Sequence, residues 1–233
     1  MKIAVIISGE PRFSSQLDSF IESLKYADQI DWFFYLWDHT TVKYTKLQVP
    51  LSWKDIISKE WALTTIKTHF PSNHNIIDVQ IENQNIVPPM FNSEHVLFKQ
   101  FYSLNQVDIL RQQHGPYDLV IRGRIDLSIP TTFDLNTIKT LIDQNPKLIF
   151  TPINNRHGLY DLNDQLAISS PENISIYTSL INYINQYKSQ GIIEHPETLL
   201  GHHLISNNLE IRRDLLVGEL RDPNNTEGFG KWN

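Results

Sequence analysis

Two arginines and one aspartate occupy alternate positions in the segment Arg122-Gly-Arg124-Ile-Asp126. Alternate side chains of an extended chain project to one side, so we expect the three charged groups to converge. Paired guanidinium groups bind a pyrophosphate, and an aspartate binds a divalent cation or a sugar hydroxyl. The alternative is a structural ion pair between arginine and aspartate. We favour a binding site, because charges placed directly after a buried strand are costly when they are buried without partners.

A turn-forming segment, Ser8-Gly9-Glu10-Pro11-Arg12, follows the apolar run Ile3–Ile7. Gly9 permits close approach of the backbone to a ligand, and Arg12 offers a bidentate fork for a phosphate. Taken alone, the segment is more simply interpreted as a tight turn with a surface arginine. Because it has one glycine where the dinucleotide fingerprint needs three, and because it is no Walker A loop, NAD and P-loop chemistry are disfavoured.

Two further segments carry acidic candidates for acid–base chemistry. Asp161–Gln165 precedes a predicted strand and follows a polar loop at 154–158. This loop suits recognition of a hydroxyl-rich acceptor, and an ordinary polar loop is an equal alternative. Glu197 heads an apolar stripe in a predicted helix, where it either matches the helix dipole, the commoner case, or points into a cleft. His203 lies near that stripe, and a hydrogen-bonded core histidine is favoured there over a metal ligand.

The composition excludes several classes of protein. The 233 residues include no cysteine, which rules out disulfides, thiolate nucleophiles and cysteine-based metal sites. The formal net charge of -6 is unsuited to phosphate neutralisation, so we expect no nucleic-acid partner. The apolar runs are too short for a membrane span or a signal peptide. We therefore expect no transmembrane segment and a cytoplasmic location.

The candidate residues need a scaffold that brings the ends of strands together. Apolar sequences predict buried strands at Ile3–Ile7, Asp31–Asp38 and Leu119–Ile121. We expect further strands at Asn75–Ile81, Lys147–Phe150, Leu166–Ser169 and Leu209–Val217. Helical spacing and caps predict helices at Leu17–Leu24, Ser52–Trp61, Ser93–His114, Leu135–Ile142, Pro171–Lys188 and Pro196–Ser206. We expect a single α/β domain over 1–221, with a mostly parallel central sheet flanked by helices, and a polar tail over 222–233. Ligands of such sheets bind beyond the carboxyl ends of the strands.

Six segments, in this order, resemble small GT-A-type glycosyltransferases and capsular-polysaccharide-synthesis-like proteins of bacteria and viruses. They are Ile6–Arg12, Phe33–Asp38, Gln100–Leu104, Tyr117–Leu127, Asn163–Ile168 with Tyr177, and Glu197 with His203-Leu204. They extend over most of the chain and leave 40–92 uncovered. They indicate the fold and the general activity, and they do not specify the sugar.

The resemblance implies transfer of a sugar from a nucleotide-diphosphate donor to a hydroxyl-bearing, glycan-type acceptor. It assigns donor contacts to Ser8, Gly9, Arg12, Asp38, Gln100, Arg122, Arg124 and Asp126. The family's Asp-x-Asp metal motif reads Arg124-Ile-Asp126 in this chain, which leaves the need for a metal open. If Mn²⁺ or Mg²⁺ binds, Asp126 is the first candidate ligand and His203 a second.

The implied reaction needs positive charge on the leaving nucleoside diphosphate, from Arg12, Arg122, Arg124 or a cation. An inverting enzyme also needs a carboxylate base beside the acceptor hydroxyl. Asp164 is our first choice and Glu197 our second, and a retaining outcome stays open. The alternative functions are a catalytically silent GT-A-like protein that binds a nucleotide or carbohydrate, favoured by the incomplete metal motif, and a scaffold protein.

Overall fold

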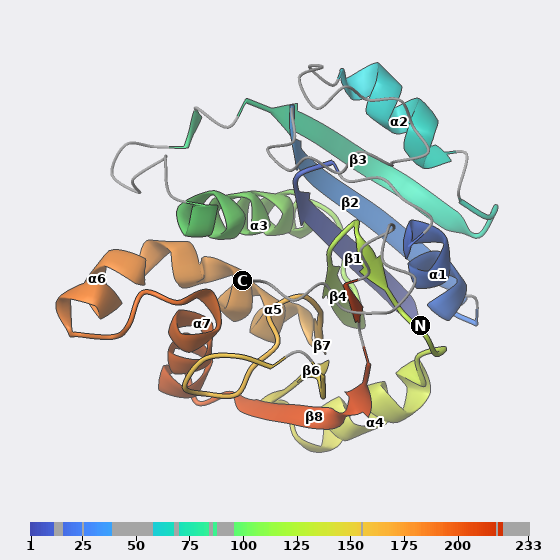
Figure 1. Ribbon diagram of the computed structural model, residues 1–233. Helices are drawn as coiled ribbons and strands as arrows, with labels where there is room; N and C mark the ends of the chain where they lie inside the picture. Colours follow the sequence, from blue (N-terminus) through green and yellow to red (C-terminus); the bar gives the residue numbers. More distant parts are fainter. Residues whose placement is uncertain are drawn as a thin grey trace, which may run out of the picture.

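A seven-stranded sheet in the order β3-β2-β1-β4-β7-β6-β8 forms the centre of the computed structural model (Figure 1). The structure describes residues 1–11, 16–24, 26–38, 58–67, 70–83, 86–87, 96–154, 156–217 and 219–220. The strands are β1 (Lys2–Gly9), β2 (Gln29–Trp37), β3 (His74–Glu82), β4 (Leu119–Gly123), β6 (Leu148–Pro152), β7 (Ala167–Ser169) and β8 (Glu210–Leu216). A second, small sheet pairs β5 (Leu127–Ser128) with β9 (Glu219–Leu220).

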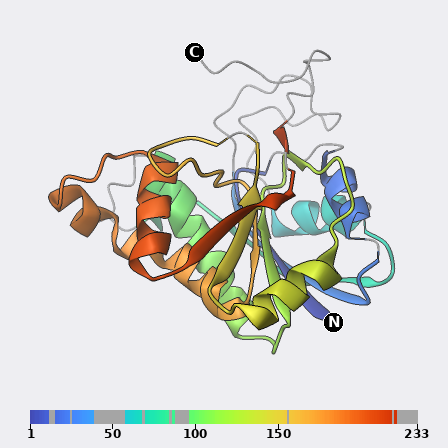
Figure 2. The same cartoon turned by 90° about the horizontal axis from the view of Figure 1, so that it is seen from below.

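Helices cover both faces of the main sheet, as the view along its edge shows (Figure 2). One face carries α1 (Gln16–Ser23), α2 (Lys59–Lys67) and α4 (Leu135–Gln144). The other carries α3 (Val96–Gln112), α5 (Pro171–Thr178), the 3-10 helix η3 (Ser179–Asn182), α6 (Ile184–Ser189) and α7 (Pro196–Ser206). The predicted α/β fold with a mostly parallel sheet flanked by helices is therefore confirmed.

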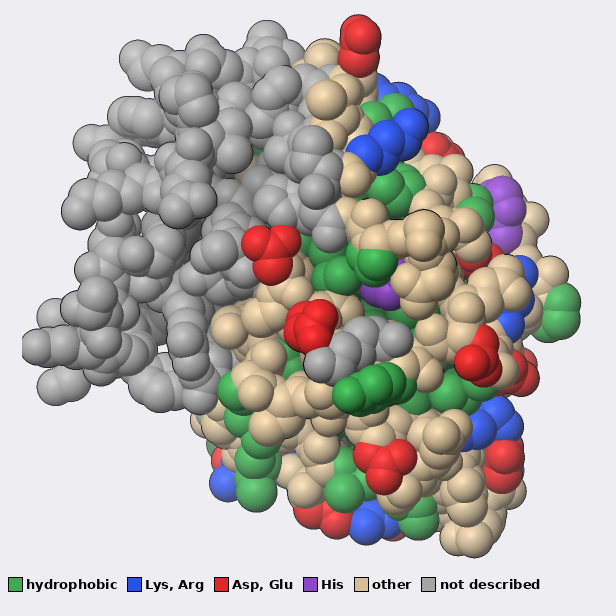
Figure 3. Space-filling model, turned by 90° about the vertical axis from the view of Figure 1, so that its right-hand side faces the viewer, with side chains coloured by type: hydrophobic (Ala, Val, Ile, Leu, Met, Phe, Trp, Pro, Cys, Tyr) green, Lys and Arg blue, Asp and Glu red, His purple; other side chains and the backbone are tan. Residues whose placement is uncertain are grey.

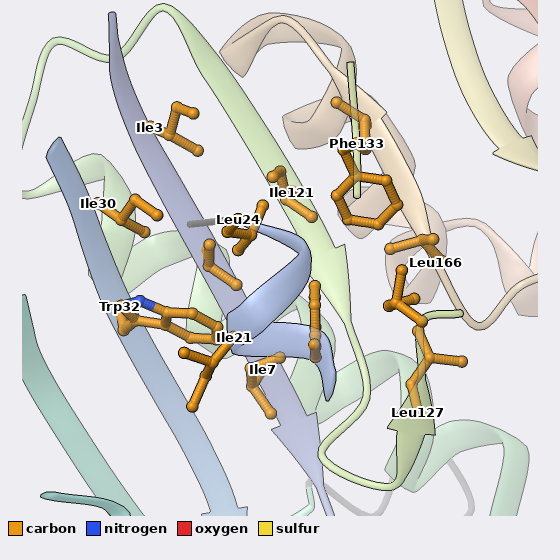
Figure 4. Close-up of a cluster of buried hydrophobic side chains, with 14 of the residues drawn as sticks. Ile3, Ile7, Ile21, Leu24, Ile30, Trp32, Ile121, Leu127, Phe133 and Leu166 are labelled. Carbon is orange, nitrogen blue, oxygen red and sulfur yellow. The ribbon is translucent and has the colours of Figure 1, made fainter. Parts of the chain in front are cut away.

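The central strands are buried on both faces, which explains their continuous apolar sequences. In β1, Ile3 and Ile7 face the layer of α1, whereas Ala4 and Ile6 face the layer of α3. Around α1, the side chains of β1, β2 and β4 converge on Ile21 and Leu24 (Figure 4). Burial of these apolar side chains on both faces stabilises the sheet that positions the candidate residues.

Strand β7 is antiparallel to both of its neighbours, β4 and β6. The pairs β1–β2, β1–β4, β2–β3 and β6–β8 are parallel. Ala167 at the start of β7 lies opposite Arg122 near the carboxyl end of β4. The segment that precedes β7 therefore lies at the same edge of the sheet as the carboxyl ends of β1, β2 and β4. This reversal brings Asp161–Gln165 to the edge where ligands of α/β proteins bind.

The helix predicted over Pro171–Lys188 is wrong in its middle. It begins as expected, because the Ser170 hydroxyl accepts a hydrogen bond from the Asn173 amide (3.3 Å) and Pro171 opens the first turn. The hydroxyls of Thr178 and Ser179 donate to the carbonyls of Ser175 (3.2 Å) and Ile176 (2.8 Å). Such bonds compete with the helical ladder, and the chain continues as η3 before α6.

Three other expectations concern residues that the structure does not describe. Most of the predicted helix Ser52–Trp61 lies outside the described residues, and α2 begins at Lys59. The predicted tail 222–233 lies wholly outside them, as does Arg12.

On the face seen in Figure 3, acidic and basic side chains of the described residues are interspersed with apolar and neutral ones. Of the helices described, none is both long and apolar enough to cross a membrane.

Candidate functional site

Asp164 and Glu197 form a carboxylate pair at the carboxyl edge of the sheet. Asp164 lies just before β7 and is 6% exposed. Glu197 lies in the first turn of α7, and its side chain is 13% exposed. Burial, followed by the negative charge of Asp164, raises the pKa of Glu197 above its ordinary value. Both candidates for the general base are therefore brought together, close enough for one charge to act on the other.

The amide of Gln100 orients the Asp164 carboxylate. Gln100 projects from the first half of α3, and its Nε2 donates a hydrogen bond to Asp164 Oδ2 (2.5 Å). Because the amide is neutral, this bond fixes the carboxylate without cancelling its charge. Gln100, which the resemblance assigned to donor binding, therefore contacts the proposed base in this structure.

Two histidines outside the set of residues expected from sequence act on Glu197. His195 Nδ1 lies 3.2 Å from Glu197 Oε2, within ion-pair distance but without hydrogen-bond geometry. A backbone hydrogen bond, and then the charges of His195 and His157, act to lower the pKa of Glu197 against the raising effects described above. The position of His195 directly before Pro196 could have indicated that it lies at the start of α7, near Glu197. Histidine is an uncommon N-cap residue, so this position did not attract attention.

Arg122 lies inside the sheet layer, 2% exposed, and not at its surface. Its Nη1 donates a hydrogen bond to the carbonyl oxygen of Asp164, and its guanidinium carbon lies 5.9 Å from the centre of the Tyr177 ring. The Tyr177 hydroxyl donates to the same carbonyl oxygen (2.9 Å). Arg122 thus contacts the backbone of the proposed base.

Arg124 and Asp126 pair with each other after the end of β4. Nε and Nη2 of Arg124 donate to Oδ1 and Oδ2 of Asp126, over 2.9 and 2.8 Å. The two side chains are 25% and 17% exposed, so a ligand at this edge has access to both. The expected convergence of three charged groups is therefore wrong for Arg122, which is buried in the layer of α5. Arg124 and Asp126 form the ion pair that is the alternative from sequence.

The ends of β1 and β2 complete this edge of the sheet. Ser8 and Gly9 end β1 and are half-buried. Gly9 has a φ of 112°, a conformation that favours glycine, so the turn itself requires this residue. Asp38 follows β2, and its Oδ2 accepts a hydrogen bond from Asn83 Nδ2 (2.9 Å). These residues share the edge with Asp164.

Comparison with known proteins gives a likeness in structure and none in sequence. No protein-family model matches the chain, and no curated protein matches its sequence. The fold is similar to that of the apo form of the glycosyltransferase GlyE from Streptococcus pneumoniae TIGR4, with a TM-score of 0.52. The chain has a glycosyltransferase-like fold. The two chains are 14% identical over 92% of this chain and 46% of GlyE, so this chain spans less than half the length of that protein.

The glycosyltransferase-like fold raises the question of a divalent cation, and the residues described do not fit one. Both oxygens of Asp126 are bound by Arg124. Both ring nitrogens of His203 form hydrogen bonds within the protein: Nδ1 with the Tyr187 hydroxyl (2.8 Å), and Nε2 with the Ile176 carbonyl (2.9 Å). Within the described ranges, no three histidine, aspartate or glutamate side chains are grouped to hold a metal.

His203 is a hydrogen-bonded core histidine, which is the alternative favoured from sequence. It is 1% exposed, and burial lowers its pKa to about 4. The narrower resemblance to capsular-polysaccharide-synthesis-like proteins stays a prediction, as do the cation and the cytoplasmic location.

A cavity of about 320 Å³ lies at the opposite end of the sheet, between the end of α1 and the start of α4. Its one acidic side chain, Asp134, caps α4 by accepting from the Thr137 amide (3.0 Å). The cavity therefore does not coincide with the carboxylate pair, and we assign it no part in the chemistry.

Proposed function

We propose that this protein is a glycosyltransferase that moves a sugar from a nucleoside-diphosphate donor to a hydroxyl group of a glycan-type acceptor. The observation that carries the proposal is the interacting pair of the buried Asp164 and the partly buried Glu197 at the carboxyl edge of a glycosyltransferase-like sheet. A sheet of this kind binds its ligands at that edge. Two carboxylates that interact in one poorly solvated site are an arrangement found where carboxyl groups take acid and base roles.

The chemistry assigned to Asp164 is general base catalysis. The acceptor hydroxyl transfers its proton to the Asp164 carboxylate while its oxygen forms a bond to the anomeric carbon of the donor. The bond from the anomeric carbon to the phosphate oxygen breaks, and the nucleoside diphosphate leaves with the bonding electrons. Gln100 supports this role, because its hydrogen bond of 2.5 Å holds the carboxylate in one orientation.

The leaving diphosphate needs positive charge, which we assign to Arg124. Arg124 is partly exposed at the end of β4, whereas the Arg122 guanidinium is buried against Tyr177. A diphosphate competes with Asp126 for the Arg124 fork, since guanidinium groups bind phosphate and carboxylate oxygens in the same geometry. The described acidic residues do not form a metal site, so we assign the charge to Arg124 and not to a cation.

One observation favours a second function, a silent nucleotide- or carbohydrate-binding protein. The Arg124–Asp126 ion pair engages both oxygens of the single carboxylate left in the metal motif. In this second function, the protein binds a donor and does not turn it over.

A panel of UDP-, GDP- and other sugar nucleotides, with and without Mn²⁺, tests the proposal. A donor at about 100 times its dissociation constant raises the free energy of unfolding by about 2.7 kcal/mol, seen as a higher melting temperature. We expect one donor to give this shift and also slow release of nucleoside diphosphate. A shift without release or transfer supports the silent binder, and no shift with any donor contradicts both functions.

A further inference from the structure

The carbonyl oxygen of Asp164 accepts hydrogen bonds from two buried side chains on two other elements. Tyr177 of α5 donates through its hydroxyl (2.9 Å), and Arg122 of β4 donates through Nη1. Tyr177 is fully buried and Arg122 is 2% exposed. Two donors that reach one oxygen from a strand and a helix fix both the position and the direction of that peptide group.

The Asn163 side chain holds the other end of the same peptide group, the Gln165 amide. Asn163 Nδ2 donates to the Asn154 carbonyl (2.7 Å), and Asn163 Oδ1 accepts from the Gln165 amide (2.8 Å). With the bond from Gln100 to the carboxylate, the backbone and side chain of Asp164 each have their own fixed partners. Such a network holds a group in one geometry before a substrate arrives.

Arg122 is an unusual residue for its place in β4. Val120, two residues earlier on the same strand face, belongs to the apolar layer of α3 and α5, where a hydrophobic side chain is the ordinary occupant. A buried charge is costly unless its donors are satisfied, and Nε of Arg122 has no hydrogen-bond partner among the described residues. Stability therefore does not explain the choice of arginine, whereas the bond to Asp164 gives it a role.

We propose that Arg122 and Tyr177 are positioning residues that hold Asp164 for the reaction, and that Arg122 does not contact the diphosphate of the donor. The inference rests on the proposed function for its effect on turnover. Loss of either hydrogen bond, from Arg122 or from Tyr177, lets the Asp164 peptide group rotate, so the carboxylate moves away from the acceptor hydroxyl. The contacts between Arg124 and the sugar-nucleotide donor stay intact. Turnover therefore falls, and the affinity for the sugar nucleotide does not.

Tyr177→Phe and Arg122→Lys test the inference, with Tyr187→Phe as the matched control. Tyr187 is a buried tyrosine of the same layer. Its hydroxyl forms a hydrogen bond with His203 and not with Asp164. We expect Tyr177→Phe and Arg122→Lys to lower kcat by about 10-fold or more, because small misplacements of a reacting group are costly, with the donor KM unchanged. Tyr187→Phe leaves both constants unchanged. A higher donor KM with normal kcat in Arg122→Lys overturns the inference, because Arg122 then contacts the donor.

Hydrogen–deuterium exchange decides the same question without turnover. We expect faster amide exchange over 162–165 in Tyr177→Phe and no change there in Tyr187→Phe. Equal exchange in the two variants overturns the inference, even where Arg122→Lys fails to fold. If the wild-type protein turns over no donor, the proposed function fails, while faster exchange confined to 162–165 still supports the positioning of Asp164.

Discussion

Arg124 and Asp126 form a two-bond ion pair across a single intervening residue, with N–O distances of 2.9 and 2.8 Å. The carboxylate thereby occupies the fork that we assign to the leaving diphosphate. Arg212 and Asp214 on β8 form a second pair of the same spacing and geometry, at 2.7 and 2.8 Å. The second pair provides a control for the first.

The exchange of Asp126 for a diphosphate gives the first prediction. In the presence of EDTA, we expect Asp126→Asn to tighten nucleoside-diphosphate binding, because it removes the carboxylate that competes for the Arg124 fork. Asp214→Asn leaves binding unchanged. Isothermal titration calorimetry with and without Mn²⁺ measures both. If Asp126→Asn instead abolishes a Mn²⁺-dependent component of binding, Asp126 is a metal ligand and the exchange model is wrong.

The role of Asp164 as base gives the second prediction. Asp164→Asn lowers kcat by about 10²–10⁴-fold, the usual contribution of a general base, and leaves donor affinity nearly unchanged. Asp161→Asn is the matched control, since Asp161 lies in the same loop, with its side chain 61% exposed and paired to Arg156. Steady-state kinetics with a donor found in the panel separates kcat from KM. Unchanged turnover in Asp164→Asn refutes the assignment.

The pKa of Glu197 gives a third prediction that needs no activity. Burial and the charge of Asp164 both raise this pKa, so removal of the charge in Asp164→Asn lowers it again. In a ¹³C NMR titration of the glutamate carboxyl groups, we expect Glu197 to titrate above the ordinary range near 4.3. Its midpoint moves to lower pH in Asp164→Asn. Equal midpoints would mean that the two carboxylates do not interact.

Acid sensitivity of the fold gives a fourth prediction. Burial lowers the pKa of His203, and also that of His74, to about 4. Below about pH 6.5 the unfolded chain takes up protons that these folded histidines do not accept until about pH 4. The free energy of unfolding therefore falls as the pH drops through this range, by on the order of 3 kcal/mol for each histidine.

Urea denaturation at several pH values between 7 and 4 measures this dependence. We expect His203→Gln to be less stable at neutral pH, because the partners at Tyr187 and Ile176 are disturbed. Its stability then varies less with pH than that of the wild-type protein. The same slope in both proteins would exclude His203 as a source of the acid sensitivity.

Close packing at Gly123 gives a fifth prediction. A Cβ at this position would clash with Cε1 and Cζ of the Phe20 ring. Phe20 is fully buried, so the ring has little room to move. We expect Gly123→Ala to lower the free energy of unfolding by about 1–3 kcal/mol, the range for overpacked cores. Combination with Phe20→Leu removes the ring that clashes. If the double variant loses as much free energy of unfolding as the two single variants together, this explanation is wrong.

The order of the elements was largely predictable from local sequence. Apolar runs gave β1, β2 and β4, and the start of α7 at Pro196 matches the prediction. These features depend on short-range signals, namely side-chain period, a cap and a proline, which neighbouring residues carry in full. The hydrogen bonds from the Thr178 and Ser179 hydroxyls to the backbone are also local. Whether such bonds interrupt a helix depends on packing, so the break at η3 could not be predicted from local sequence.

The candidate site was predictable as a set of residues and not as an arrangement. From sequence alone, Asp164 and Glu197 were candidate bases, and Arg122 and Arg124 were equivalent candidates for the diphosphate. The reversed direction of β7 decided that Asp164 lies beside the end of β4, and the packing of α5 turned Arg122 inward. Strand direction and side-chain burial depend on contacts between residues far apart in the chain. Local sequence therefore determined which groups this protein has, and only the tertiary structure decided which of them meet.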